Sequence, residues 1–365
     1  MENNKQNQTN DTINNISVPQ LLRYFSQIDE HDLGIEAKTG FDVFDAEDCN
    51  LYGGIHEGLY ILGAVSSLGK TSFCLQLADQ ISEHGQDVLF FSLEQSPYEL
   101  LSKSISRHTY LIAREQKKDD YKHLAKETAQ ILNKHRYKFY TSEEKDIVSM
   151  AIKNYSTQAK HLYIFPGQYQ GKRLTVTDIS NIVKEHISKE NNIPIIFIDY
   201  LQLLAMSNPT FRGTDKQAID FVTTSLKGVS RKFKTAVIAI SSFNRESYNA
   251  PITLASFKES GSIEYSADLL FGLEYGEING PGMEHQKLET DKDYRIRIAT
   301  LKENNMKKKA NKTPVTILLK CLKNRNGNTF SCNFNFLHAY NYFEEIKKDQ
   351  NNFSFPVHQN NFLQQ

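Results

Sequence analysis

Short apolar runs recur along the chain, and longer segments with helical spacing of apolar residues separate them. The runs lie at 58–65, 87–94, 161–167, 193–200, 235–243 and 268–275. Between them, segments such as 72–83 and 178–189 are long enough for helices. Continuous apolar runs that alternate with helices are typical of a parallel sheet buried on both faces. The pattern predicts an α/β fold with a mostly parallel central sheet and helices on both faces.

The pattern changes in the last part of the chain. Residues 294–301, 313–324 and 328–336 read as strands, and the Lys-rich segment 302–312 between the first two reads as a solvated loop. Asn326-Gly327 separates the last two strands and is a strong hairpin signal. We therefore expect a C-terminal antiparallel extension of the sheet.

The remaining segments predict how the chain is divided. Residues 98–158 form a long helical insertion within one domain, 39–345. Residues 1–16 are polar and Asn-rich and predict a disordered tail, and 346–365 predict a polar C-terminal tail. Residues 17–38 contain a short amphipathic helix, which either packs on its own domain or docks on a neighbouring subunit.

The composition argues against a uniformly basic protein, a cysteine-ligated metal protein and a membrane-spanning protein. Lys+Arg and Asp+Glu both number 43 in 365 residues, so the formal net charge is zero. This balance argues against a surface coated with positive charge but leaves room for a local nucleic-acid site. The four cysteines have no metal-knuckle spacing and predict reduced thiols in the cytoplasm. No apolar run approaches the ~20 residues of a membrane span, and no apolar signal core begins the chain.

The stretch GAVSSLGKTS, residues 63–72, predicts a phosphate-binding loop. A predicted strand precedes it and a predicted helix follows it, so backbone N–H groups and the helix N-terminus would point at one spot. Gly69 allows close approach of the backbone, Lys70 supplies a cation to the β and γ phosphates, and the Thr71 hydroxyl can ligate Mg²⁺. Ala64 stands where the strict motif has Gly, and the alternative is an ordinary Gly-Ser turn. The predicted nucleotide-binding residues are Ser66, Ser67, Gly69, Lys70, Thr71 and Ser72.

Two carboxylates complete the predicted site. Asp199 ends a buried strand, at the edge where open parallel sheets bind ligands, and can hold Mg²⁺ through water. Glu94 ends the strand that follows the loop in sequence, and it could orient or deprotonate an attacking water. A capping or surface role is the alternative for Glu94.

The motifs TGFDVFD, GAVSSLGKTSF, VLFFSLEQS, IIFIDYLQLL, ISSFNR, ESGSIEYSADLL and LKNRNG occur in the order and spacing of one family. From about residue 39 to 343 the chain resembles the ATPase domain of DnaB-type replicative helicases, which has a RecA-like core and commonly has Ala at the position of Ala64. The resemblance implies a homo-hexameric ring that threads single-stranded DNA and hydrolyses ATP at subunit boundaries. It also implies that Lys323 and Arg325 reach into the neighbour's site, where a guanidinium stabilises transition-state charge. A pair of solvated hairpin charges is the alternative.

The resemblance also implies DNA-contacting residues. Lys258, Glu259 and Gly261 in KESGSIE match the loop that lines the central channel, where contacts to phosphates would be independent of sequence and sensitive to salt. Arg212 and Lys216 are weaker candidates for the same channel, with a solvated loop as the alternative.

The chain departs from the family in two respects. Ser242 replaces a polar amide that would sense the γ phosphate, and with Arg245 it forms the predicted coupling pair. About 38 residues precede the core, whereas the family carries a separate N-terminal domain that meets primase, so a primase or loader remains only a possible partner. The sequence thus favours an ATP-dependent DNA helicase, with 5′–3′ polarity expected only from the resemblance. One alternative is a RecA-like ATPase that loads or remodels a replication partner without unwinding. Another is a DNA-binding scaffold that uses nucleotide only to close its ring.

Overall fold

The computed structural model describes residue 18 and residues 35–47, 51–116, 121–169, 171–207, 212–244, 251–257, 260–279 and 289–347. The chain divides into two units, residues 1–34 and 35–365. In the first unit the described residue is Val18, which is helical and exposed. The predicted tail at 1–16, and most of the predicted segments 17–38 and 346–365, lie outside the described residues.

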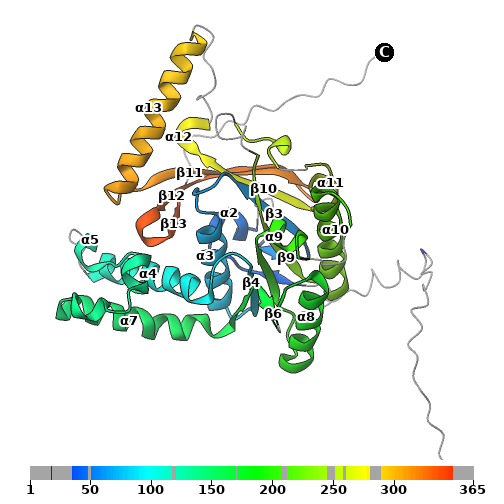
Figure 1. Ribbon diagram of the computed structural model, residues 1–365, viewed down its shortest axis with the longest axis horizontal. Coiled ribbons are helices and arrows are strands. Elements are labelled where there is room, and N and C mark those ends of the chain that lie inside the picture. Colours follow the sequence, from blue (N-terminus) through cyan, green and yellow to red (C-terminus); the bar gives the residue numbers. More distant parts are fainter. Residues whose placement is uncertain are drawn as a thin grey trace, which may run out of the picture. The chain divides into compact units, whose positions relative to one another are not determined.

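A nine-stranded sheet forms the centre of the second unit, in the order β13-β12-β11-β10-β3-β9-β8-β4-β5 (Figure 1). Six neighbouring strands, from β10 to β5, run parallel. They are β3 (Gly58–Ala64), β4 (Val88–Ser92), β5 (Leu162–Pro166), β8 (Ile195–Asp199), β9 (Ala236–Ser242) and β10 (Leu269–Tyr275). Each lies within one of the six apolar runs, so the predicted parallel sheet is confirmed.

The antiparallel extension is also confirmed. It consists of β11 (Val315–Asn324), β12 (Ser331–Leu337) and β13 (Tyr342–Glu345), and β11 pairs with β10. The Asn326-Gly327 turn connects β11 to β12, as its sequence predicts. The short strand β13 was not predicted; it follows a single 3-10 turn (His338–Tyr340) and pairs back onto β12.

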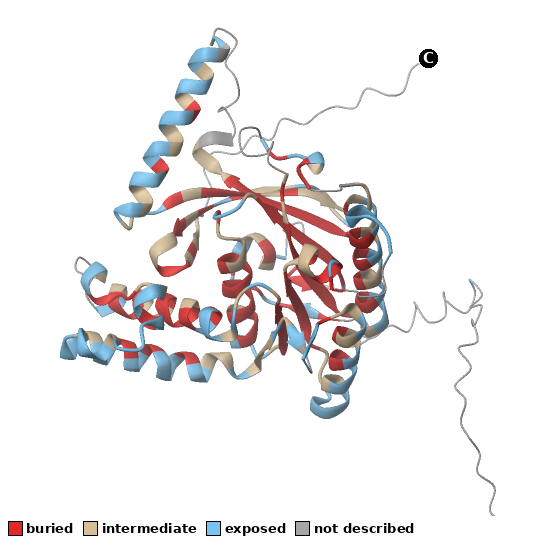
Figure 2. Ribbon diagram, viewed as in Figure 1, coloured by how far each residue is buried: buried red, intermediate tan, exposed pale blue. Residues whose placement is uncertain are grey.

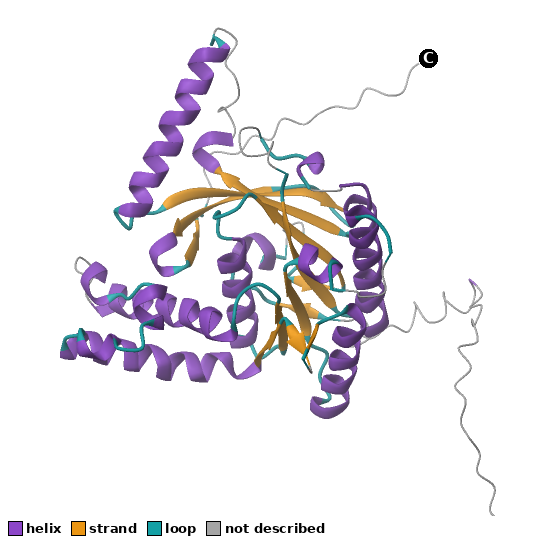
Figure 3. Ribbon diagram, viewed as in Figure 1, coloured by secondary structure: helices purple, strands orange, loops and turns teal. Residues whose placement is uncertain are grey.

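The parallel strands are apolar throughout because both of their faces are covered. In β3, Tyr60 and Leu62 belong to one core and Leu59 and Ile61 to the other. Helices α2 (Asp42–Asp45) and α3 (Lys70–Glu83) contribute to the first core, and α8 (Val176–Glu190), α9 (Leu201–Ala205), α10 (Asp215–Phe233) and α11 (Ser260–Ser266) to the second. Figure 2 shows the strands buried and the helices buried along one side, and Figure 3 shows the helices placed around the sheet.

The predicted insertion at 98–158 is helical. It comprises α4 (Pro97–Gln116), α5 (Tyr121–Leu124), α6 (Thr128–Leu132), a 3-10 turn (Arg136–Lys138) and α7 (Ser142–Gln158), packed around a third core. Buried Asp79 of α3 links the insertion to α3. Its carboxylate accepts hydrogen bonds from Ser104 (2.7 Å) and Tyr155 (2.9 Å) and pairs with Arg107.

The predicted strand at 294–301 and the predicted loop at 302–312 are wrong, because α13 (Asp291–Ala310) spans both up to Ala310. The alternation of Tyr294, Ile296 and Ile298 with arginines imitates a strand. However, β10 already pairs with β3 and β11, so this segment has no place beside β10 in the sheet. Thr290 instead caps a helix by accepting a hydrogen bond from the Asp293 N–H. Three lysines in the last turn suit the negative end of the helix dipole.

The smaller elements are β1 (Glu36–Ala37), β2 (Ile55–His56), β6 (Gln168–Tyr169), β7 (Lys172–Arg173), α12 (Gly276–Asn279) and 3-10 turns at Ala159–His161 and Leu254–Ser256. The described helices include none with the length and apolar character that a membrane crossing requires. Cys74, Cys321 and Cys332 are buried thiols, and none of these described cysteines forms a disulfide.

Candidate nucleotide-binding site

The loop between β3 and α3 has the conformation that a phosphate cradle needs. Gly69 caps α3 with a φ of 98°, in the left-handed region. A Cβ at this position would lie 2.6 Å from a ring carbon of Phe336, so space and conformation both require glycine. Ala64 is the last residue of β3, where the strand backbone does not require glycine. This explains why Ala is compatible with the loop despite the strict motif.

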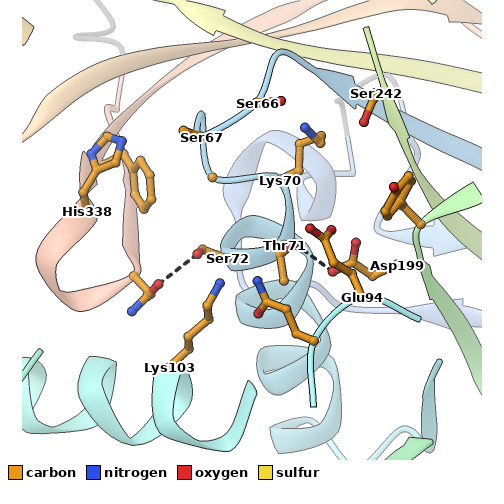
Figure 4. A pocket seen from close by; sticks show the side chains of 15 residues that line it. Ser66, Ser67, Lys70, Thr71, Ser72, Glu94, Lys103, Asp199, Ser242 and His338 are labelled. Atoms are coloured by element: carbon orange, nitrogen blue, oxygen red, sulfur yellow. Dashed lines mark hydrogen bonds between the residues drawn. The ribbon is translucent and has the colours of Figure 1, made fainter. Parts of the chain in front are cut away.

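All six predicted nucleotide-binding residues line one cavity of about 440 Å³, together with Glu94, Asp199 and Ser242 (Figure 4). The carboxyl ends of β3, β4, β8 and β9 meet at this edge of the sheet. The Leu93 N–H donates to the Asp199 carbonyl (2.7 Å), which ties the end of β4 to the end of β8. Glu94 and Asp199 are therefore brought to the same pocket from strands that are far apart in the sequence.

Thr71 and Asp199 form the polar centre of the cavity. The Thr71 hydroxyl donates to Asp199 Oδ2 at 2.7 Å. The pKa of Asp199 is raised to about 6, mainly by burial and to a smaller extent by the nearby Glu94 carboxylate. The Thr71 hydrogen bond, Lys103 and Lys70 act in the opposite direction. A hydroxyl and a carboxylate side by side at a phosphate loop are the hard oxygen donors that Mg²⁺ prefers. These two residues fit the predicted metal.

Lys70 begins α3 and folds back over the loop. Its ammonium donates to the carbonyl oxygens of Ala64 (3.1 Å) and Val65 (3.2 Å). The charge is thus held at the end of β3, beside the loop whose N–H groups would receive phosphate oxygens. This is the position that a lysine needs to contact a bound polyphosphate.

Lys323 and Arg325 lie far from the cavity of their own chain. Lys323 is opposite Leu270 at the start of β10, and the Arg325 N–H donates to the Asp268 carbonyl. Asp268 in turn lies beside Leu59 of β3, since its N–H donates to the Leu59 carbonyl. Leu59 precedes the phosphate loop by six residues, which is about 20 Å at the usual rise per strand residue. The two side chains contact the end of α11: Lys323 donates to the Ala267 carbonyl (2.8 Å) and Arg325 to the Tyr265 carbonyl (3.1 Å).

The predicted DNA-contacting and coupling residues are only partly described. Lys258, Glu259 and Arg245 lie outside the described residues. Gly261 lies in α11, where a Cβ would meet nothing within 4 Å. Arg212 and Lys216 are exposed near the start of α10. Ser242 ends β9 and lines the cavity beside the phosphate loop.

Six further residues line the cavity that were not predicted as site residues: Gln95, Lys103, Tyr200, Phe336, His338 and Asn341. Burial, with a smaller effect of Lys309, lowers the pKa of His338 to about 3, so its imidazole is neutral. Ser72 donates to the Asn341 side chain (2.9 Å), which joins α3 to the C-terminal strands. Gln95 and Tyr200 directly follow Glu94 and Asp199 in the sequence. The other four come from the insertion and the C-terminal strands, whose sequences carry no phosphate-binding pattern.

Known proteins resemble this chain in sequence and in fold. The family model for the DnaB-like helicase C terminal domain matches residues 36–345. A probable replicative DNA helicase of Trieres chinensis is 32% identical over 222 residues, covering 59% of this chain and 42% of that protein. The replicative DNA helicase DnaB of Helicobacter pylori (strain 26695) is 26% identical over 322 residues, covering 85% and 59%. The chain spans about half the length of the curated relatives it matches.

Two solved structures share the fold. The ATPase domain of G40P superimposes with a TM-score of 0.63 at 21% identity, covering 90% of this chain and 98% of that one. A DnaB-like replicative helicase, described with its interactions with primase, gives 0.64 at 20% identity, covering 91% and 68%. The core is therefore a RecA-like ATPase fold. With the family model matching most of its length, the chain belongs to the family of the DnaB-like helicase C-terminal domain.

Proposed function

We propose that the chain binds and hydrolyses ATP with Mg²⁺ and uses the energy to move along single-stranded DNA and separate its strands during replication. The observation that carries this proposal is the convergence of Lys70, Thr71, Glu94 and Asp199 on one cavity behind a phosphate loop. Each has the chemistry of one part of phosphoryl transfer to water.

The residues divide the work as follows. Lys70 and the N–H groups at the start of α3 hold the phosphates, and Thr71 and Asp199 hold Mg²⁺, which when bound offsets the phosphate charge. Glu94 orients the attacking water and accepts its proton. Asp199 must be ionised for this role, and with a pKa of about 6 it is mostly ionised at pH 7.

The site is completed by a second copy of the chain. Lys323 and Arg325 cannot reach their own cavity, about 20 Å away along the sheet, and the Arg325 side chain is 43% exposed. A neighbouring copy in a ring would present this guanidinium to the phosphates. Hydrolysis then depends on subunit contact. We propose a homo-hexamer in the cytoplasm, with Lys258, Glu259 and Gly261 lining a central DNA channel.

The test is a paired measurement on the purified chain. ATP turnover should rise when single-stranded DNA is added and should be lost in Lys70→Ala, and a forked duplex should be unwound under the same conditions. A chain that hydrolyses ATP and leaves the fork intact would contradict the helicase assignment.

Ser242 favours a second candidate, a RecA-like ATPase that loads or remodels a replication partner without unwinding. Ser242 lines the cavity, but its side chain is shorter than the amide that the family places there. For this candidate, a protein partner such as a loader or primase would change the ATPase rate and DNA would not.

A further inference from the structure

Lys103 differs from several other shielded lysines in the described part of the chain. Lys126, Lys227 and Lys320 each pair with a carboxylate, namely Glu144, Asp268 and Glu274. Lys103 is half-buried, as Lys227 and Lys320 are, and it lines the nucleotide cavity. Its ammonium nevertheless makes no hydrogen bond and no ion pair in the part of the chain that the structure describes. Withdrawing an ammonium from water costs free energy unless a partner compensates, so this position points to a ligand.

The backbone that carries Lys103 is held firmly against α3. The adjacent residue Ser104 donates to Asp79 at 2.7 Å, and Arg107, one turn further along α4, pairs with the same carboxylate. Asp79 lies on the helix that begins at the phosphate loop. Lys103 is therefore supported at a fixed distance from the loop, and Figure 4 shows its side chain extending toward Ser72 and Thr71.

Before Mg²⁺ binds, the charged side chains of the cavity balance only when Lys103 is counted. The charged side chains of the described lining are Glu94 and Asp199 against Lys70 and Lys103, since His338 is neutral. Without Lys103 the lining would carry a net negative charge, which repels a polyphosphate. Burial lowers the pKa of Lys103, while Asp199 and Glu94 act to raise it, so an incoming anion would stabilise its charged form.

We propose that Lys103 is a second phosphate-binding lysine, supplied by the helical insertion, that contacts the polyphosphate of the nucleotide in the cavity opposite Lys70. The inference rests on the proposed ATP-binding function. This contact would give the insertion a direct part in nucleotide binding. Lys103 belongs to α4, and α4 packs against α6 and α7 of the insertion.

The test compares Lys103→Met, Lys103→Arg and the control Lys153→Ala in the full chain. Lys153 is an exposed lysine of α7 on the same insertion. Binding is measured with a fluorescent ATP analogue and Mg²⁺, with inorganic tripolyphosphate as competitor, and the thermal midpoint is measured with and without MgATP.

Lys103→Met should weaken nucleotide and tripolyphosphate binding by about tenfold or more, because a charge-assisted contact is lost. Its unliganded midpoint should not fall, and the upward shift caused by MgATP should shrink. The nucleotide affinity of Lys103→Arg should stay within about threefold of wild type. The control Lys153→Ala should bind nucleotide as tightly as wild type does.

Unchanged binding in Lys103→Met would overturn the proposal. So would a lower unliganded midpoint in Lys103→Met without rescue by Arg, because that result marks a structural role. A wild-type chain that bound no nucleotide would overturn the proposed function as well. Nucleotide binding that Lys70→Ala abolishes and Lys103→Met leaves intact would remove the Lys103 proposal alone.

Discussion

Asp199→Asn should stabilise the nucleotide-free protein and abolish its ATPase activity. The Asp199 side chain is 1% exposed and faces a second carboxylate, Glu94, across the cavity. At neutral pH the folded protein must therefore keep a buried charge that the unfolded chain would leave in water. Asparagine removes that charge while its side-chain oxygen can still accept the 2.7 Å hydrogen bond from Thr71.

The size of the effect follows from the pKa. The pKa of Asp199 is raised from 3.8 to about 6, and the separation of about two units corresponds to about 3 kcal/mol when both states are ionised. Because the folded-state pKa is the higher one, wild-type stability from this group is fully present below pH 3.8 and is lost as the pH rises through about 6. The advantage of Asp199→Asn should be largest at pH 7 and should fall to about half at pH 5.

Urea unfolding of the nucleotide-free chain at pH 7 and pH 5 measures this advantage, and ATP turnover is measured in parallel. The matched control is Asp268→Asn, another buried aspartate, whose carboxylate pairs with Lys227 and accepts from the Leu59 N–H (2.7 Å). That control should destabilise, because it leaves Lys227 without its partner. The reasoning is refuted if Asp199→Asn is less stable than wild type at pH 7, or if its gain grows as the pH falls.

Three further predictions concern neighbouring residues. Glu94→Gln should bind ATP normally and hydrolyse it about a hundredfold more slowly, because the base for water is lost; wild-type turnover in this variant would instead support a scaffold that only closes its ring. Gly69→Ala should weaken nucleotide binding and lower the thermal midpoint, because it combines a φ of 98° with a contact of 2.6 Å to Phe336; unaltered affinity in a binding titration would speak against the cradle. Arg107→Met should lower the free energy of unfolding by about 3–5 kcal/mol, because buried Asp79 loses its cation; urea unfolding checks this, and a loss below about 1 kcal/mol would contradict it.

Most of the sheet could be predicted because its strands are buried on both faces. Leu59 to Leu62 must all be apolar when alternate residues enter two cores, and the short length of the run favours a strand over a buried helix. The antiparallel hairpin was predictable for a different reason, since Asn326-Gly327 favours a tight turn independently of its surroundings. Both signals are local in the sequence.

The segment at 294–310 could not be predicted in this way. Its alternating residues fit a strand as well as a helix, and the choice depends on whether β10 still has a free edge, which is a property of the whole sheet. The low amphipathicity of α13, where Ile298 is the buried apolar side chain among its described residues, left no helical stripe to read. The pairing of strands across the whole sheet, rather than the local sequence pattern, therefore determines that this segment is a helix.

Site residues could be predicted where they belong to the phosphate-loop motif or stand at the end of a predicted strand. Thr71 and Asp199 were expected together because parallel strands end at one edge, and their hydrogen bond agrees. Lys103, His338 and Asn341 were not expected, because only the packing of the insertion and the C-terminal strands against α3 brings them to the cavity. Lys103 is the one lysine of α4, and nothing in its sequence neighbourhood marks it.

The central claim is that the ATPase site is shared between two copies of the chain, and mixing two inactive variants tests it most directly. Arg325→Ala keeps the cavity and Lys70→Ala keeps the guanidinium, so each alone should be inactive in the presence of single-stranded DNA. In an equimolar mixture, about a quarter of the boundaries would join an intact cavity to an intact Arg325. We predict that turnover returns toward that fraction of wild type. A mixture as inactive as its components, or an Arg325→Ala protein that hydrolyses ATP at the wild-type rate by itself, would contradict the account.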